Sequence, residues 1–238
     1  MNRPKFERFL QIKKDLLGSC KKCQGKGYIK NELCDCMKKF DYYLLLSEHG
    51  IEKEFWDLEF KDWKGDEVAR SFAEKYVERI KNFLLEGIGL VFCGPNGTGK
   101  TMLMSVIFKE ALKKNYSVHS ITFSEILELL SWNSYPLLNT FKEKDFFGID
   151  EFNLENSFSK FDPNLAFKFT SLVRFRRRNL LPTFVTTNLS ELNFKKMIGS
   201  TLTSLFIATC KFVSVEGPDF RVEQSKKIDR VFEDQKKE

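Results

Sequence analysis

Residues 94–101 read GPNGTGKT, and this stretch constrains the fold more than any other part of the sequence. It matches the pattern G-x-x-x-x-G-K-[ST], in which glycines let backbone N–H groups turn inward around phosphate oxygens. The lysine of such a loop reaches the β- and γ-phosphates, and the final hydroxyl ligates Mg²⁺. We therefore expect a nucleotide to be bound by Gly94, Pro95, Asn96, Gly97, Thr98, Gly99, Lys100 and Thr101.

The segments around this loop predict an α/β fold. An apolar run at 88–94 precedes the loop and a helical pattern at 101–115 follows it, as the motif requires. Four more apolar runs follow, at 117–123, 144–151, 183–188 and 211–217. Their alternation with helical patterns is typical of a parallel sheet, in the element order of a P-loop NTPase.

Several helix boundaries also carry sequence signals. Apolar residues recur at helical spacing before the first strand, at Val68, Phe72, Tyr76, Ile80 and Phe83. Gly87 is expected to stop this helix. Ser124, Asp162 and Ser190 are predicted N-caps of later helices, and Pro163 suits the first helical position after Asp162.

Two carboxylates, Asp150 and Glu151, end the third apolar run. A carboxylate at a strand end can hold Mg²⁺ through water, and a second can polarise an attacking water. Such a pair alone can be a solvated strand edge, but its position about 50 residues after a phosphate loop favours the functional interpretation. We expect Asp150 and Thr101 to hold magnesium and Glu151 to activate water.

Asn188 closes the next apolar run, at 183–188. A polar side chain at that strand tip would lie near the γ-phosphate, where it could orient the attacking water. Asparagine is also favoured in turns and helix caps, so the position alone does not distinguish the two roles.

Four of the six cysteines lie within residues 20–36, as Cys20-x-x-Cys23 and Cys34-x-Cys36. Four thiolates are what a tetrahedral zinc site requires, although four unrelated reduced cysteines are the alternative. Cys93 and Cys210 lie in apolar patterns and are expected to be buried thiols.

Three zones follow from these features: a zinc-binding module at 1–48, a connector at 49–67 and the ATPase domain at 68–238. The net charge of +6 permits contact with nucleic acid without demonstrating it. No apolar run has the length of a signal peptide or of a bilayer span, so we expect a cytoplasmic protein with no membrane partner.

From about residue 55 onward, the sequence resembles the DnaC/DnaI-type helicase loaders, AAA+ ATPases related to the IstB transposition helpers. The resemblance is carried, in family order, by GPNGTGKT, FSEILELL, FFGIDE, LLPTFVTTNLS and EGPDFR. It implies a five-stranded parallel sheet in AAA+ order, with ATP bound between neighbouring, self-associated subunits. It also implies that Asn188 is the sensor asparagine and that Arg221 is a sensor arginine touching the nucleotide.

The cysteine segment adds to this resemblance. Its GKG and K-K-x-F context is similar to the N-terminal zinc module of DnaI-type loaders, which contacts the replicative helicase and helps to control access to DNA. A DnaJ-like element is a second interpretation, but the DnaJ zinc domain repeats its motif and this chain has it once. A DNA-binding finger surrounded by lysines is a third.

One stretch departs from the family pattern. The loaders usually carry Ser-Arg-Leu before the last strand, and that arginine reaches the ATP of a neighbouring subunit. Here residues 201–210 read TLTSLFIATC, with Leu205 or a neighbour in its place. Arg176 in RFRRR is the candidate substitute; helix-dipole cations and DNA-phosphate contacts are the other interpretations of these arginines.

Together these features predict an ATP-dependent loader of a hexameric replicative helicase onto single-stranded DNA during replication initiation. ATP, Mg²⁺ and Zn²⁺ are the expected cofactors. The alternatives are an IstB-like transposition helper and an ATP-gated adaptor with weak hydrolysis.

Overall fold

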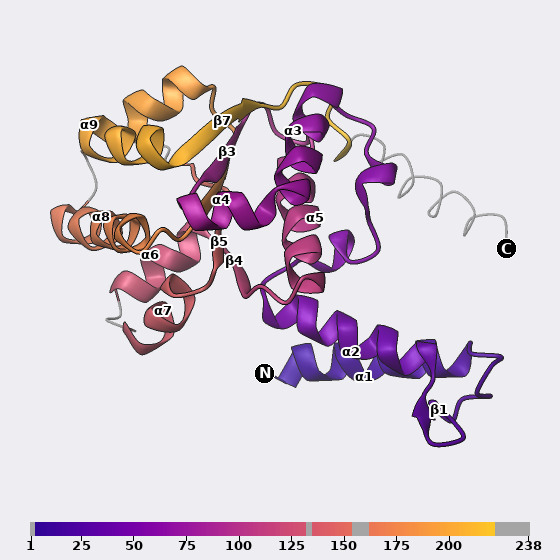
Figure 1. The fold of residues 1–238 in the computed structure, drawn as a ribbon. Helices are drawn as coiled ribbons and strands as arrows, with labels where there is room; N and C mark the ends of the chain where they lie inside the picture. The colour runs from indigo at the N-terminus through magenta and orange to yellow at the C-terminus, as the bar shows by residue number, and fades with distance from the viewer. Residues whose placement is uncertain (1–2, 132–134, 154–161, 222–238) are drawn as a thin grey trace, which may run out of the picture. The chain divides into compact units, whose positions relative to one another are not determined.

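The computed structural model describes residues 3–131, 135–153 and 162–221, which belong to two compact units (Figure 1). The chain passes from one unit to the other between Trp56 and Asp57, inside the connector expected at 49–67. Among the described helices, none has both the length and the apolar character needed to cross a bilayer.

The N-terminal unit is built on two helices, α1 (Arg3–Gly18) and α2 (Asp35–Glu48), which pack against each other. Between them lies a short antiparallel hairpin of β1 (Tyr28–Ile29) and β2 (Glu32–Leu33). The 3₁₀-helix η1 (Lys53–Phe55) closes the unit.

Aromatic side chains form much of the core of this unit. The indole of Trp56 stacks on the rings of Tyr43 and Phe9, with centroids 4.8 and 5.8 Å apart. Its Nε1–H donates to the carbonyl of Ile51 at 2.8 Å. The last residues of the unit are therefore fixed onto both helices, since aromatic pairs at these distances contribute beyond the area they bury.

The C-terminal unit contains a five-stranded sheet in the order β4-β5-β6-β3-β7. All four strand pairs are parallel. The strands are β3 (Gly89–Cys93), β4 (Val118–Thr122), β5 (Phe146–Asp150), β6 (Thr183–Thr187) and β7 (Cys210–Ser214). The predicted α/β fold with five parallel strands is confirmed, and the carboxyl ends of all five strands share one edge.

Helices cover both faces of this sheet (Figure 1). One face carries α3 (Glu67–Glu78) and α5 (Lys100–Lys113). The helices that cover the other face are α6 (Phe123–Ser131), α7 (Tyr135–Lys142), α8 (Pro163–Arg178) and α9 (Glu191–Thr209). The 3₁₀-helix η2 (Phe60–Asp62) precedes α3, and α4 (Ile80–Glu86) follows it.

The helix predicted to run from Val68 to Gly87 is two helices, α3 and α4, with a break at Arg79. Gly87 ends α4 in the left-handed conformation, as predicted. The buried face of α3 consists of Ala69, Ala73 and Tyr76. Val68 and Phe72, expected on that face, are exposed, because the two small alanines are the side chains that lie against the core.

Two of the three predicted helix caps are confirmed. The side chain of Asp162 accepts from Asn164 N–H at 2.8 Å, and that of Ser190 accepts from Asn193 N–H at 3.3 Å. The prediction for Ser124 is wrong because α6 begins one residue before it, at Phe123. Thr122 is the cap instead: Thr122 Oγ1 accepts from Glu125 N–H, and the Glu125 carboxylate accepts from Thr122 N–H, which forms a capping box.

Candidate active site and metal centre

The phosphate loop runs from the end of β3 to the first residue of α5. Gly97 and Gly99 both have left-handed backbones, with φ of 73° and 91°. A Cβ on Gly97 would collide with the carboxylate of Asp219, and a Cβ on Gly99 would collide with the indole of Trp63. The sequence therefore needs glycine at both positions, for conformation and for space.

Lys100 is almost fully buried at the start of α5, and its ammonium group donates to the Pro95 carbonyl inside the loop. Burial lowers the pKa of Lys100, and the nearby charge of Asp150 opposes this shift. A buried cation held inside a loop at a helix N-terminus is suited to binding phosphate groups.

Asp150 ends β5 with only 4% of its surface exposed. Its Oδ1 accepts hydrogen bonds from Thr101 Oγ1, at 3.0 Å, and from Thr186 Oγ1. Burial raises the pKa of Asp150, whereas the two hydroxyl donors act in the opposite direction. The structure thus brings together the carboxylate and the hydroxyl predicted to hold magnesium, and such oxygen donors suit this hard cation.

Glu151 is exposed and has a left-handed backbone, with φ of 52°. Its N–H donates to Thr186 Oγ1 at 3.0 Å. The strand therefore ends at Asp150, and the Glu151 side chain is free to meet water at the carboxyl edge of the sheet.

Asn188 directly follows β6 at the same edge. Its side-chain oxygen is buried without a hydrogen-bond partner among the described residues. Leaving a buried acceptor unpaired costs about 1–3 kcal/mol, so such an atom calls for an explanation. A ligand or water bound at the phosphate loop would supply the missing donor.

The segment after β7 returns to the phosphate loop. Val215 N–H donates to Cys93 O at 2.7 Å, and Phe220 N–H donates to Gly97 O at 3.0 Å. Arg221 follows immediately, and its positive charge contributes to lowering the pKa of Lys100. The GPDFR stretch is therefore close to the loop that it was expected to approach.

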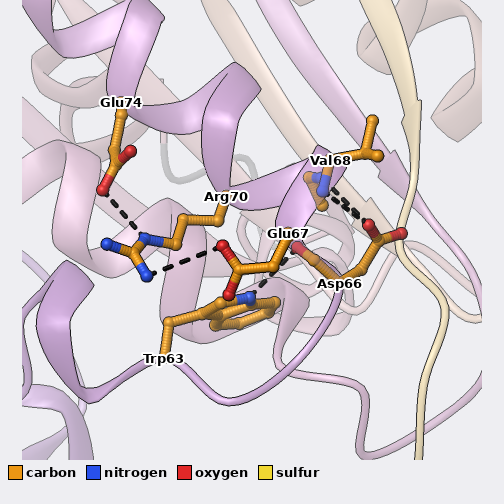
Figure 2. Close-up of polar contacts among 7 residues, drawn as sticks. Trp63, Asp66, Glu67, Val68, Arg70 and Glu74 are labelled. Atoms are coloured by element: carbon orange, nitrogen blue, oxygen red, sulfur yellow. Dashed lines mark hydrogen bonds and ion pairs between the residues drawn. The ribbon is translucent and has the colours of Figure 1, made fainter.

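Trp63 and Asp66 are site residues that the sequence analysis missed (Figure 2). The indole of Trp63 lies against Gly99 and donates to the Asp66 carbonyl at 3.1 Å. The Asp66 carboxylate caps α3 by accepting from Val68 N–H at 2.8 Å, and it also accepts from Glu216 N–H at 3.3 Å. Asp66 thus joins the start of α3 to the segment after β7. An aspartate just before a helical pattern is a cap signal that the sequence offered.

Arg176 does not fit the predicted role of an arginine finger. The side chain is 1% exposed, and its guanidinium lies over the ring of Phe147. It donates to Thr183 Oγ1 and to four backbone carbonyls, those of Lys142, Lys144, Asp145 and Pro182. These contacts contradict the prediction, because a buried guanidinium that donates its hydrogen bonds to residues of its own unit cannot extend to a neighbouring subunit.

The other arginines of this helix have a different environment. Arg174, Arg177 and Arg178 are exposed, and within the described part of the chain they form no ion pair. Leu205, in the stretch where the family arginine was expected, is buried in the core. No described residue of 201–210 offers a cation in its place.

The four cysteines of the N-terminal unit come together between α1 and α2. Cys20 Sγ lies 3.7 Å from Cys34 Sγ, and Cys23 Sγ lies 3.6 Å from Cys36 Sγ. All four sulfur atoms lie within 4.8 Å of one another. Zn–S bonds of about 2.3 Å in a tetrahedron place sulfur atoms roughly 3.8 Å apart, so the cluster fits zinc.

The surroundings of the sulfur atoms also fit a thiolate site. Gly27 N–H donates to Cys23 Sγ at 3.2 Å. A backbone N–H of Cys23 lowers the pKa of the Cys20 thiol to about 7. Burial raises the pKa of Cys36 to about 12, and a bound metal cation would oppose this shift by favouring the thiolate.

The chain matches no protein-family model and no curated protein. Solved structures do resemble it. A DnaI crystal structure aligns with a TM-score of 0.58 and 21% identity, over 71% of this chain and 93% of the chain in that structure. A crystal structure of a DnaC helicase loader aligns with a TM-score of 0.59 and 19% identity, over 69% of this chain and all of the chain in that structure.

A third similar structure is AMPPCP-bound DnaA from Aquifex aeolicus, with a TM-score of 0.56 and 15% identity, over 77% of this chain and 57% of the chain in that structure. At these identities the similarity shows the fold alone, which matches that of AAA+ structures.

We predict that the purified protein contains one zinc ion per chain, and that Cys34→Ser with Cys36→Ser removes it. The change should loosen the N-terminal unit, because a unit of this size has little core and the metal would supply folding energy. Metal analysis by mass spectrometry and near-ultraviolet circular dichroism of the aromatic cluster measure the two effects. Cys210→Ser, which changes a thiol of the C-terminal unit, is the control and should retain zinc. Zinc-free wild-type protein with an intact aromatic signal would contradict the assignment.

Proposed function

We propose that this chain is an ATP-dependent loader of a hexameric replicative helicase onto single-stranded DNA during replication initiation. The observation that carries the proposal is the combination of two features in one short chain. One is a four-sulfur cluster in a small N-terminal unit, and the other is an AAA+ unit with a complete phosphate-loop constellation. Two of the structures that the chain resembles are a DnaI and a DnaC helicase loader, which supports this choice.

Within the proposed ATPase site, each side chain has a separate task. The loop N–H groups and Lys100 bind the phosphates of ATP and offset their charge. Thr101 and Asp150 would hold Mg²⁺, which neutralises charge on the β- and γ-phosphates. Arg221 approaches from the segment after β7 and adds a second cation near the loop.

Hydrolysis then depends on Glu151 and Asn188. Glu151 accepts a proton from water as the water oxygen bonds to the γ-phosphorus. The bond from this phosphorus to the bridging oxygen breaks, and ADP keeps the electron pair. Asn188 Oδ1, buried and lacking a partner among the described residues, accepts a hydrogen bond from the same water and orients it.

The absence of an arginine from 201–210 and the burial of Arg176 favour a second candidate, an ATP-gated adaptor with weak hydrolysis. An arginine finger contributes about 10³–10⁵ in rate, so a site without one turns over slowly. In this version of the proposal, ATP binding sets the conformation of the chain, and hydrolysis only returns the chain to its previous conformation.

One exposed face of α8 supports the proposed contact with single-stranded DNA. Phe167 is 66% exposed, and Arg174 and Arg178 lie on the same face of the helix, seven and eleven residues later. The three side chains span about 16 Å along the helix axis. An exposed aromatic ring followed by exposed arginines fits stacking on a base and contact with successive phosphates.

We predict that Glu151→Gln retains ATP binding and lowers turnover by at least about 100-fold, because the amide cannot accept the proton. Lys100→Ala should abolish ATP binding itself. Equilibrium binding of a fluorescent ATP analogue and phosphate release measure the two steps. Glu143→Gln, an exposed carboxylate before β5, is the matched control and should behave as wild type. If Glu151→Gln hydrolyses ATP at the wild-type rate, this assignment of the base is wrong.

We further predict that the wild-type chain retains the replicative helicase of its own cell in a pull-down, and that the zinc-free double cysteine variant does not. The reason is that the proposed docking unit needs the metal to fold. Lys100→Ala should still bind, which separates docking from ATP binding. Failure of the wild type to bind helicase, together with filament formation on duplex DNA, would replace this proposal with the transposition-helper alternative.

The double change Arg174→Ala with Arg178→Ala should weaken binding to oligo(dT). The slope of log K against log salt concentration is negative, and its magnitude should decrease by about 1.4, since each lost phosphate contact on a single strand contributes about 0.7. Fluorescence anisotropy over a range of salt concentrations measures this slope. Lys75→Ala with Arg79→Ala removes the same charge from exposed positions elsewhere in the unit and should leave the slope unchanged. Equal effects from both pairs would show that net charge alone is responsible.

A further inference from the structure

Thr186 is a buried polar residue of β6, 1% exposed, that lies between the two carboxylate residues of the site. Its hydroxyl donates to Asp150 Oδ1 and accepts from Glu151 N–H at 3.0 Å. Its backbone carbonyl accepts from Phe152 N–H at 2.8 Å. One residue therefore holds three successive residues at the end of β5.

The position of these bonds in the sheet explains why a side chain is needed. The ladder between β5 and β6 pairs Ile149 with Val185, and no later pair of these strands follows. Beyond this point Glu151 turns into the left-handed region, where its N–H no longer meets a strand carbonyl. The Thr186 hydroxyl takes the place of that carbonyl and satisfies the amide.

We infer that Thr186 is a positioning residue for ATP hydrolysis, acting on Asp150 and Glu151 without touching ATP. A non-glycine residue in the left-handed region is strained and persists only when its surroundings fix it. The hydrogen bond from Glu151 N–H fixes that turn and thereby sets the direction in which the Glu151 side chain leaves the strand. The same hydroxyl donates to Asp150 Oδ1 and thereby sets the orientation of the Asp150 carboxylate.

The kinetic test compares two substitutions at this position and rests on the proposed ATPase function. Thr186→Val keeps the shape and removes the hydroxyl, and kcat should fall roughly 10- to 100-fold, as for other residues that orient reacting groups. The KM for ATP should stay within about threefold of the wild-type value, because the residues that bind the phosphates equally in the ground state and the transition state are unchanged. Thr186→Ser keeps the hydroxyl and should restore most of kcat.

Thr183→Val is the matched control on the same strand. Its hydroxyl accepts from Arg176 Nε at 3.0 Å, away from the carboxylates, and thermal unfolding records the stability lost in each variant. A general loss of stability would lower the folded fraction of both valine variants. Only a positioning role lowers kcat of the folded protein in Thr186→Val and not in Thr183→Val.

A second readout needs neither nucleotide nor activity. Hydrogen exchange of the Glu151 amide, followed by NMR in the nucleotide-free protein, should be at least tenfold faster in Thr186→Val than in wild type or Thr186→Ser. Unchanged exchange in Thr186→Val would overturn the inference, as would wild-type kcat in Thr186→Val or equal losses of kcat in the valine and serine variants. A wild-type protein that lacks ATP turnover but shows the predicted exchange pattern would remove the proposed function and leave the positioning contact standing.

Discussion

The site depends on one buried carboxylate, Asp150, and on the two hydroxyls that share its Oδ1. A carboxylate at this depth is costly unless it is hydrogen-bonded, so its neighbours cannot be placed independently. Thr101 comes from α5 and Thr186 from β6, and both meet a residue at the end of β5. These contacts tie the helix of the phosphate loop to β5 and β6, and they put the predicted magnesium ligands side by side.

The parts of the site that could be predicted from the sequence are those fixed by local chemistry. The phosphate loop needs particular residue types at adjacent positions, and the strand before it and the helix after it follow from short apolar patterns. The positions of Asp150 and Asn188 follow from the same logic, since Asp150 is the last residue of a buried strand and Asn188 directly follows another. All of these residues come to one edge because the sheet is parallel.

The parts that could not be predicted depend on contacts between distant segments. Arg176 lies in the middle of an apparently exposed basic run, yet its guanidinium donates to the carbonyls of Lys142, Lys144, Asp145 and Pro182. Nothing in the local pattern RFRRR distinguishes the buried arginine from the three exposed ones. The role of Thr186 could not be predicted either, because its strand is an ordinary run rich in β-branched residues. That role depends on where the pairing of β5 with β6 stops.

The two candidate sites are joined by a very short stretch of chain. Trp56 belongs to the aromatic core of the N-terminal unit, and Trp63 lies against Gly99 of the phosphate loop. Only residues 57–62 separate them. Trp63 is also tied through Asp66 to the start of α3 and to the segment that leads to Arg221. Trp63, which lies against the phosphate loop, is therefore only seven positions along the chain from Trp56, which packs in the aromatic core of the unit that carries the sulfur cluster.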